Sequence, residues 1–570
     1  MYVKTTVVRR GNRQYQYLSI VEARRSGKRV THDTLLRLGE VSQLKESGQL
    51  DRIIAALTEH ANDTWCAASS LEADGDGPSV GNIEAVYAYW CRLGLDRHFA
   101  DIGEARGSQV LAEAVFSMVA NRLIKPRSKR RAITDWIGID VRLPVGLTQP
   151  SLDQCYRALD VVAEMKQETE GFLYSSLCNL TNLDLTFALY DLTSTYFEGA
   201  SRASAKFPSK AFGYSRDHRS DCPQVALGLL TTSDGIPVAH HVFSGNTSDK
   251  STVPQVVDDL KSRFGVNSMC FVGDRGMVSN DNIAHILASN CDYIMATRLH
   301  RDKLCEAALI AAATPYTHWL PVPEASSFAA EVDISGTRCV VVASPERYQR
   351  DLARTRELVA RCEKKLLALE WRVRDGELSA AGQIGRAAQA ILGPSGVSRL
   401  FDVEISPGRF IYHYNESAMA YDEELLAGRY VLTTSLDSSQ ASTERIVMAY
   451  RGLLNVEHRF RVMKDFLGLR PVYHWTERRV HGHIAICVLA ATIEALMAAD
   501  LVHADVRDPD LRFQHMTPRR ALRETSRIRL VEMQAGERRV EVISRRTPLQ
   551  AQVLAAFGVD TTPWASATID

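Results

Sequence analysis

The amino-acid sequence predicts an α/β protein whose central part is a mixed sheet covered by helices. Apolar runs over residues 185–196, 223–232 and 236–243 predict three strands, and the turn Ser233-Asp234-Gly235 joins the last two as an antiparallel hairpin. Short strands and helices then alternate, in the order helix 252–264, strand 269–272, helix 282–289 and strand 293–297. This order of elements favours a single α/β core.

Three antiparallel strands followed by strand–helix alternation is the order of an RNase H-like core. The chain has 570 residues, which is long for one domain. Apolar residues make up 45% and charged residues 24%, as in ordinary soluble globular proteins. We therefore expect the core, over residues 183–297 and 438–503, to be accompanied by further domains.

The first 65 residues predict a small basic domain of strands and a helix. Residues 2–39 alternate polar and apolar side chains in places, which predicts antiparallel strands, and a helix follows over 44–60. Ten Lys and Arg against four acids give residues 1–50 a charge of +6, so we expect this domain to contact DNA. Residues 66–81 have the composition of a linker.

Residues 82–182 show helical periodicity and predict a helical DNA-binding domain. A basic cluster marks one corner of it, and its members are Arg122, Lys125, Arg127, Lys129, Arg130 and Arg131. The formal net charge of the whole chain is zero, so contact with nucleic acid is expected at such local patches. A solvated helix face is the alternative interpretation of each patch taken alone.

Residues 298–437 interrupt the core as an insertion that is β-rich and helical. Strand-like runs flank a long helix, in which apolar residues repeat every seven positions at Leu352, Val359, Leu366 and Val373. Such a seam is typical of an antiparallel helical hairpin or of a dimer contact, and we favour packing within the insertion. Residues 504–570 form a mixed, basic C-terminal region.

The cysteine pattern and the apolar segments indicate in which cellular compartment the protein is expected. Eleven cysteines are scattered without a CxxC pair, which predicts neither structural zinc nor a disulfide framework and favours a reducing cytoplasm. The N-terminus lacks the apolar run of a signal peptide. The most apolar segment, 484–502, contains Glu494 and Asp500, so we expect a buried helix and no membrane partner.

One segment, Ala449 to Lys464, carries three functional side chains at a regular interval. Tyr450, Glu457 and Lys464 are seven residues apart, and seven residues fall only about 20° short of two helical turns. We therefore expect one helix that presents all three on one face, although scattered charges on a surface helix would give the same spacing. A carboxylate between a phenol and an ammonium suits a site where phosphate meets a divalent cation.

Two aspartates are placed to complete that site. Asp191 lies inside a predicted strand, where a carboxylate is costly unless it is paired or binds metal, and Asp274 ends a buried strand in the run Gly273-Asp274-Arg275-Gly276. If both converge with Glu457 at one sheet edge, the three carboxylates would hold two Mg²⁺ ions roughly 3.5–4 Å apart. An aspartate at such a position is also often a cap or turn residue.

These residues together resemble the DDE transposases of prokaryotic insertion sequences, in the branch with a Tyr–Arg–Glu–Lys signature and a large insertion before the catalytic Glu. The resemblance extends over residues 185–500. It rests on these runs: Tyr190-Asp191-Leu192-Thr193, Val272-Gly273-Asp274-Arg275-Gly276, Tyr450…Glu457…Lys464 and Arg470-Pro471-Val472-Tyr473-His474. The resemblance implies that Asp191, Asp274 and Glu457 bind metal and catalyse. It also implies that Tyr450 and Lys464 contact phosphates beside the scissile bond.

The sequence departs from this signature at its arginine. Leu453 stands three residues after Tyr450, where the signature has Arg. Arg451 points about 100° away from Tyr450 around a helix. Arg461 lies four residues after Glu457, on the same helix face as Glu457, so we prefer it as the substitute for the signature arginine. With Arg275 and the helical-domain residues Arg127, Lys129, Arg130 and Arg131, both arginines complete the predicted DNA contacts.

The resemblance implies an insertion-sequence transposase that binds its element ends, cleaves them by Mg²⁺-dependent hydrolysis and joins the 3′-hydroxyl ends to target DNA. Two Mg²⁺ ions, with Mn²⁺ as a substitute, are the implied cofactors. Terminal inverted repeats and target DNA are the implied partners, and a homodimer is expected because two ends must be brought together. The expected location is the prokaryotic cytoplasm, at the nucleoid. A non-catalytic DNA-binding relative and an RNase H-like nuclease are the alternative functions.

Overall fold

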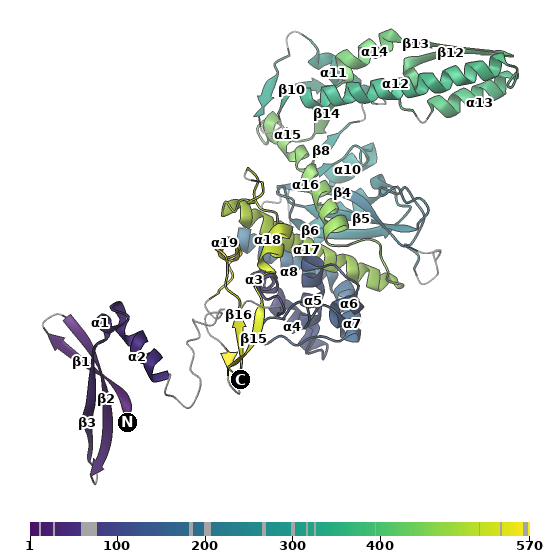
Figure 1. Ribbon diagram of the computed structural model, residues 1–570. Coiled ribbons are helices and arrows are strands. Elements are labelled where there is room, and N and C mark those ends of the chain that lie inside the picture. Colours follow the sequence, from purple (N-terminus) through teal and green to yellow (C-terminus); the bar gives the residue numbers. More distant parts are fainter. Residues whose placement is uncertain are drawn as a thin grey trace. The chain divides into compact units, whose positions relative to one another are not determined.

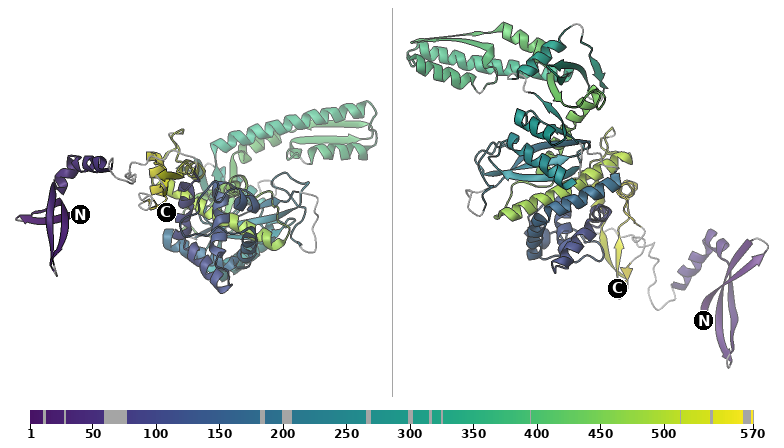
Figure 2. Two further views of the ribbon diagram at one scale, coloured as in Figure 1. Left: turned by 60° about the horizontal axis from the view of Figure 1, so that its bottom comes forward. Right: turned by 180° about the vertical axis from the view of Figure 1, so that it is seen from behind.

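The structure is a computed structural model (Figures 1 and 2). It describes residues 1–10, 13–26, 29–58, 77–181, 186–198, 207–264, 269–297, 302–314, 317–323, 326–393, 395–511, 513–535, 538–561 and 568–569. The chain forms two compact units, one of residues 1–78, 528–547 and 560–570, and the other of residues 79–527 and 548–559.

The first unit contains the predicted N-terminal sheet. Its strands β1 (Tyr2–Arg10), β2 (Arg13–Ser26) and β3 (Arg29–Glu40) pair antiparallel in chain order, which confirms the prediction. The single predicted helix over 44–60 is two helices, α1 (Val41–Glu46) and α2 (Gln49–Thr58). Gly48 separates them because its φ of +64° lies in the left-handed region, which ends a helix.

The C-terminal region, predicted as one stretch over 504–570, contributes to both units. Strands β15 (Leu530–Ala535), β16 (Arg538–Ile543) and β17 (Thr568–Ile569) belong to the first unit. Helices α18 (Pro518–Thr525) and α19 (Pro548–Ala556) belong to the second. Most of the predicted linker, residues 66–76, lies outside the described residues, but Ser79 already bridges Val141 in the second unit.

The helical prediction for residues 82–182 is confirmed in the second unit. Its helices are α3 (Gly81–Arg92), α4 (Leu95–Ala105), α5 (Leu111–Ile124), α6 (Lys129–Thr134), α7 (Leu152–Glu164) and α8 (Lys166–Thr181). Helices α5 and α7 pack on α17 (Glu477–His503). By length and composition α17 could cross a membrane, but its most apolar 18-residue window is 83% buried, as expected for a core helix.

The core is a nine-stranded sheet in the order β6-β5-β4-β7-β8-β14-β11-β10-β9. Its first five strands are β4 (Phe187–Tyr196), β5 (Gln224–Thr231), β6 (Pro237–Ser244), β7 (Cys270–Gly273) and β8 (Asp292–Ala296). Strands β4, β5 and β6 pair antiparallel, whereas β7 pairs parallel with both β4 and β8. This topology confirms the RNase H-like core.

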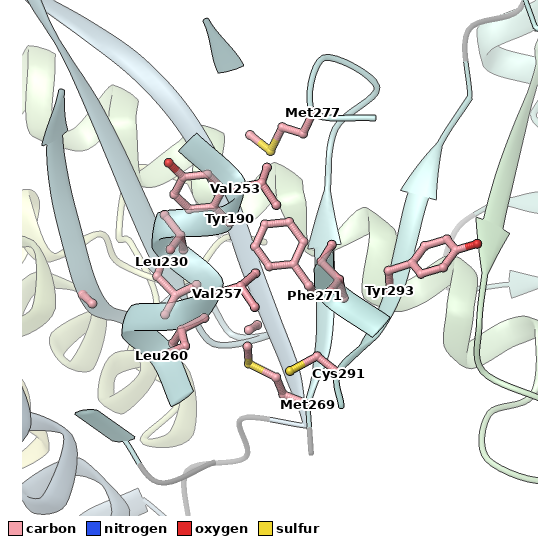
Figure 3. Close-up of a cluster of buried hydrophobic side chains, with 14 of the residues drawn as sticks. Tyr190, Leu230, Val253, Val257, Leu260, Met269, Phe271, Met277, Cys291 and Tyr293 are labelled. Atoms are coloured by element: carbon pink, nitrogen blue, oxygen red, sulfur yellow. The ribbon is translucent and has the colours of Figure 1, made fainter. Parts of the chain in front are cut away.

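Apolar packing against helix α9 (Val253–Phe264) fixes the middle of this sheet. Figure 3 shows Tyr190 and Phe271, from the adjacent strands β4 and β7, in one cluster with Val253 and Val257 of α9. All four side chains are fully buried. Helix α10 (Asn280–Ala288) follows β7 and contributes Ile286 to the same cluster. The strand that carries Asp191 and the strand that ends just before Asp274 are therefore held by one apolar core.

The insertion continues the core sheet, which sequence analysis did not predict. Its elements are α11 (Lys303–Ala312), β9 (Leu320–Val322), β10 (Ser327–Ile334), β11 (Thr337–Ala343), α12 (Pro345–Arg374), α13 (Ala381–Leu392), β12 (Phe401–Ser406), β13 (Arg409–Tyr414), α14 (Glu416–Tyr421) and β14 (Arg429–Thr434). Strand β14 pairs antiparallel with β8 and β11 with β14. The exposed edge of β8 offers unpaired backbone groups, so the added strands satisfy them.

The heptad seam of α12 is filled within the chain. Leu352, Val359, Leu366 and Val373 are buried, and the last three pack with Ile384, Ala388 and Leu392 of α13. Figures 1 and 2 show α12 and α13 side by side with the β12–β13 hairpin. The prediction that this seam packs inside the insertion is confirmed.

Replacing Leu366 by Ala should destabilise this helical hairpin. Leu366 is fully buried, and deletion of such a side chain costs about 2–5 kcal/mol. Leu367→Ala is the matched control, because the next residue along the helix is 47% exposed and should change stability by less than about 0.5 kcal/mol. Amide hydrogen exchange should show faster exchange in α12 and α13 for Leu366→Ala alone. Equal protection in both variants would contradict this packing.

Candidate active site

The three predicted catalytic acids line one cavity of about 460 Å³. Asp191 comes from β4, Asp274 directly follows β7, and Glu457 lies on α16 (Leu453–Arg461). The cavity lining also includes Arg275, Ala296, Thr297, Ser326, Ser327, Ser344, Glu346, Arg347, Arg350, Tyr430, Tyr450, Arg451, Leu453 and Leu454. Segments up to 266 residues apart in the sequence, from 191 to 457, therefore meet at this point.

Parallel pairing of β4 and β7 brings the two aspartates to adjacent positions. Tyr190 is the register partner of Gly273, so Asp191 and Asp274 are the next residue on each chain. Gly273 also permits close packing, because a Cβ there would meet Phe271 at 3.1 Å and Met277 at 3.2 Å. This close packing explains why a glycine precedes Asp274 in the run that the sequence analysis singled out.

The helix that bears Glu457 is not one continuous helix, which corrects the prediction. Helix α15 (Thr443–Arg451) ends before Gly452, α16 follows, and a π-helical turn, η6 (Val462–Phe466), comes next. A Cβ on Gly452 would lie 2.7 Å from Cδ1 of Leu189, a fully buried side chain of β4. The chain at Gly452, between α15 and α16, therefore approaches β4 so closely that a larger residue would collide with it.

The π turn changes the direction of Lys464, which does not line the cavity. A π turn takes more residues per turn than an α-helix, so the seven-residue interval after Glu457 no longer returns to the same face. Lys464 Nζ donates to Asp217 Oδ1 at 2.7 Å, and Arg470 donates to the same oxygen. Lys464 and Asp217 are 9% and 6% exposed. Burial lowers the pKa of Lys464, and Asp217 opposes that shift.

Burial and neighbouring charges determine the ionisation of Asp191. Desolvation raises the pKa of this carboxyl to about 7. The backbone N–H of Leu192, which donates to Asp191 Oδ1 at 2.8 Å, lowers the pKa, whereas the charge of Asp274 raises it and Arg216 lowers it. Glu457 raises the pKa further. Asp191 is thus close enough to both other acids for their charges to raise its pKa.

Tyr450 is held as a neutral phenol against this acidic group. Its hydroxyl lies 3.4 Å from Asp274 Oδ1, and burial raises its pKa, with Asp274 adding to the effect. Its ring centroid is 5.7 Å from that of Tyr430 on β14. The insertion therefore supplies one wall of the site.

Four arginines line the same cavity as the acids: Arg275, Arg347, Arg350 and Arg451. Arg347 and Arg350 lie in the first turns of α12 and were missed by sequence analysis, because no signature marks them. Arg347 lies over the ring of Tyr430, 5.2 Å from its centroid. Arg451 lines the cavity, whereas Arg461 is exposed on α16 and is not part of the lining, so Arg451 is the better placed of the two to stand in for the signature arginine.

The basic cluster of the helical domain is only partly a surface. Arg130 and Arg131 are exposed and Arg127 is half-buried, so these remain predicted DNA contacts. The prediction for Lys129 is corrected, because its side chain is 6% exposed and its Nζ lies 3.0 Å from Nδ1 of His483. Burial lowers the pKa of Lys129 to about 7. The spacing of basic residues on a short helix such as α6 does not show which of them points into the protein.

The acids of the cavity suit a divalent cation by their chemistry. Carboxylate oxygens are the ligands that Mg²⁺ prefers, and bound positive charge would relieve the repulsion that Asp274 and Glu457 exert on Asp191. Within the described part of the chain, no three His, Cys, Asp or Glu side chains already stand together as a ligand set. Asp191, Asp274 and Glu457 therefore fit a divalent cation as oxygen ligands.

Comparison with known proteins identifies two regions. A family model described as "Transposase DDE domain" matches residues 186–493, more than half of the chain. A model of the IS1634 family transposase N-terminal domain matches residues 3–70. A search of curated proteins finds no match.

Two solved structures are similar in part. One is a cryo-EM structure of the piggyBac transposase synaptic complex with hairpin DNA, with 10% identity and a TM-score of 0.34, covering 74% of this chain and 70% of that chain. The other is the Mos1 transposase paired-end complex with the left transposon end, with 13% identity and a TM-score of 0.14, covering 43% of this chain and 66% of that chain.

Asp217→Asn should destabilise the second unit. The change removes the negative charge from between Lys464 and Arg470, and breaking a buried ion pair costs about 3–5 kcal/mol. Asp465→Asn is the control, because Asp465 also pairs with Arg470 but is 59% exposed, and its loss should cost at most about 1 kcal/mol. Thermal unfolding of both variants measures the difference. Equal midpoints would show that Asp217 does not neutralise these cations.

Proposed function

The chain belongs to the DDE transposases of insertion sequences, and from that premise we propose that Asp191, Asp274 and Glu457 are its catalytic triad. The observation that carries this proposal is their convergence on one cavity from β4, from the end of β7 and from α16. Electrostatic coupling of Asp191 to both other acids supports it.

Enzymes with this domain act on DNA with divalent metal ions, and we propose two Mg²⁺ ions here, with Mn²⁺ as a substitute. Asp191, Asp274 and Glu457 would hold them. When bound, such ions activate a water or a 3′-hydroxyl and stabilise the leaving oxygen of an in-line phosphoryl displacement. The same site would serve hydrolysis at the element end and transesterification into target DNA, since both reactions displace an oxygen from phosphorus.

The other side chains of the cavity would orient the DNA phosphates. Tyr450, kept neutral by burial, can donate its hydroxyl hydrogen to a phosphate oxygen in place of Asp274. Arg275, Arg347 and Arg451 offer guanidinium groups, which form bidentate hydrogen bonds to phosphates. Lys464 would contact a phosphate in this scheme only after exchanging its present partner, Asp217.

The partners proposed are the terminal inverted repeats of the element and the target DNA. The N-terminal basic sheet and the exposed arginines of α6 are proposed to bind the ends. We propose a homodimer, because two ends must be held together before joining. We propose a cytoplasmic location at the nucleoid, where the DNA substrate lies.

Ala substitution of each triad member should abolish cleavage and joining of a marker flanked by the element ends, with Mg²⁺ present. End binding measured in parallel should persist, because phosphate contacts elsewhere supply most of the affinity. Asp258→Asn, an exposed acid paired with His285, is the control and should retain activity. Cleavage without joining by the wild type would favour the nuclease alternative. End binding without either reaction would favour the non-catalytic alternative.

The double change Arg130→Ala with Arg131→Ala should weaken binding to all DNA sequences alike. Each lost phosphate contact should reduce the salt-dependence slope of log K by about 1. Lys129→Met is the matched control, because Lys129 is buried in the same helix and its change should alter stability but not the slope. Binding titrations over a range of salt concentrations provide the test, and an unchanged slope in the double variant would remove α6 from the DNA interface.

A further inference from the structure

Two segments outside the cavity carry four large aromatic side chains that are mainly exposed. Phe212 and Tyr214 belong to the connection between β4 and β5, and Tyr473 and Trp475 precede α17. Their exposed fractions are 54%, 82%, 67% and 82% in that order. The catalytic scheme uses none of them.

Hydrogen bonds tie the two segments together at both ends. Ser209 donates to Glu477, and Arg470 donates to Asp217. Ser209 precedes Asp217 on one segment, whereas its partner Glu477 follows Arg470 on the other. The two segments therefore run in opposite directions. All four aromatic residues lie between these ties. We call the four residues together the aromatic surface.

Both segments are also tied to the strand that carries Asp191. The backbone N–H of Val472 donates to the carbonyl of Tyr196 at 3.0 Å, and that of Arg216 donates to Ser194 Oγ at 3.2 Å. Ser194 and Tyr196 are three and five residues after Asp191 on β4. The two segments of the aromatic surface therefore lie against the C-terminal end of β4.

The arrangement fixes the backbone while leaving the rings accessible. The Gln224 amide donates to the carbonyl of Tyr214 at 3.0 Å, which holds this residue from the β5 side. Large exposed aromatic groups are unfavourable in water unless a partner covers them, and rings on a fixed backbone lose little entropy on binding. The aromatic surface is thus already arranged for a ligand that stacks.

Stacking favours DNA as that ligand, because bases stack on aromatic rings irrespective of sequence. The cations at one end of the aromatic surface are all paired: Lys464 and Arg470 contact Asp217, Arg470 also contacts Asp465, and Arg216 contacts Asp249. A phosphate would therefore reach them only in exchange for these carboxylates.

We propose that the aromatic surface binds unpaired bases of the DNA strand next to the cleaved end. This rests on the proposed function for the choice of DNA, since cleavage beside Asp191 would leave a DNA end close to β4, to which both segments of the surface are hydrogen-bonded. Unpaired bases fit because they expose the ring faces that a duplex hides.

The test uses a single-stranded dT oligonucleotide of about 16 nucleotides and a blunt duplex of the element end. Tyr214→Ala combined with Trp475→Ala should weaken binding of the oligonucleotide about 5- to 100-fold and leave duplex binding within about twofold. Trp475→Phe, which keeps a ring, should bind nearly as the wild type does. Phe513→Ala is the control, because Phe513 is 96% exposed outside the aromatic surface and should change neither affinity.

Unchanged oligonucleotide affinity in the double Ala variant would overturn the proposal. Unchanged affinity with a lower oligomeric state in sedimentation would assign the surface to a second copy of the chain and equally overturn it. Cleavage of duplex ends by the wild type is measured on the same preparations. If the wild type fails to cleave but binds the oligonucleotide through these rings, the proposed function fails while this inference stands.

Discussion

The parallel pairing of β4 with β7 is the constraint on which the site depends. It sets Tyr190 beside Gly273 and so places Asp191 and Asp274 at neighbouring positions. The apolar cluster under α9 supports this register, because a shift of one residue would turn Phe271 away from the cluster. The free energy of burying this cluster is thus also what holds two like charges close together.

The position of the third acid, Glu457, depends on close packing between α16 and β4 rather than on the geometry of one continuous helix. Gly452 lets the chain pass over Leu189 of β4, and the resulting break sets the direction of α16. Beyond Glu457 the π turn rotates Lys464 into the protein, where Asp217 neutralises it together with Arg470. The same pair of buried contacts anchors the aromatic surface to the core. Packing of one helix on one strand thereby organises both the cavity and its surroundings.

The insertion participates in the site because it extends the core sheet. Strand β14 pairs with β8, so Tyr430 is carried to the cavity, and the connection from β11 into α12 delivers Arg347 and Arg350. The cavity therefore combines the three acids of the core with arginines from both parts, Arg275 and Arg451 from the core and Arg347 and Arg350 from the insertion. Acids and arginines in one cavity suit a substrate that brings phosphates to bound cations.

The sequence by itself determined the order of strands and helices and the heptad seam of α12, which follow from local periodicity. Its runs, such as Gly273-Asp274-Arg275-Gly276, and their resemblance to a known family also singled out the three acids that the fold brings to one cavity. Only the tertiary structure decided that Lys129 is buried, that Arg451 rather than Arg461 lines the cavity, and that the insertion completes the site. Each of those outcomes depends on contacts between distant segments, and a local pattern contains no information about which side of a helix such a contact will cover.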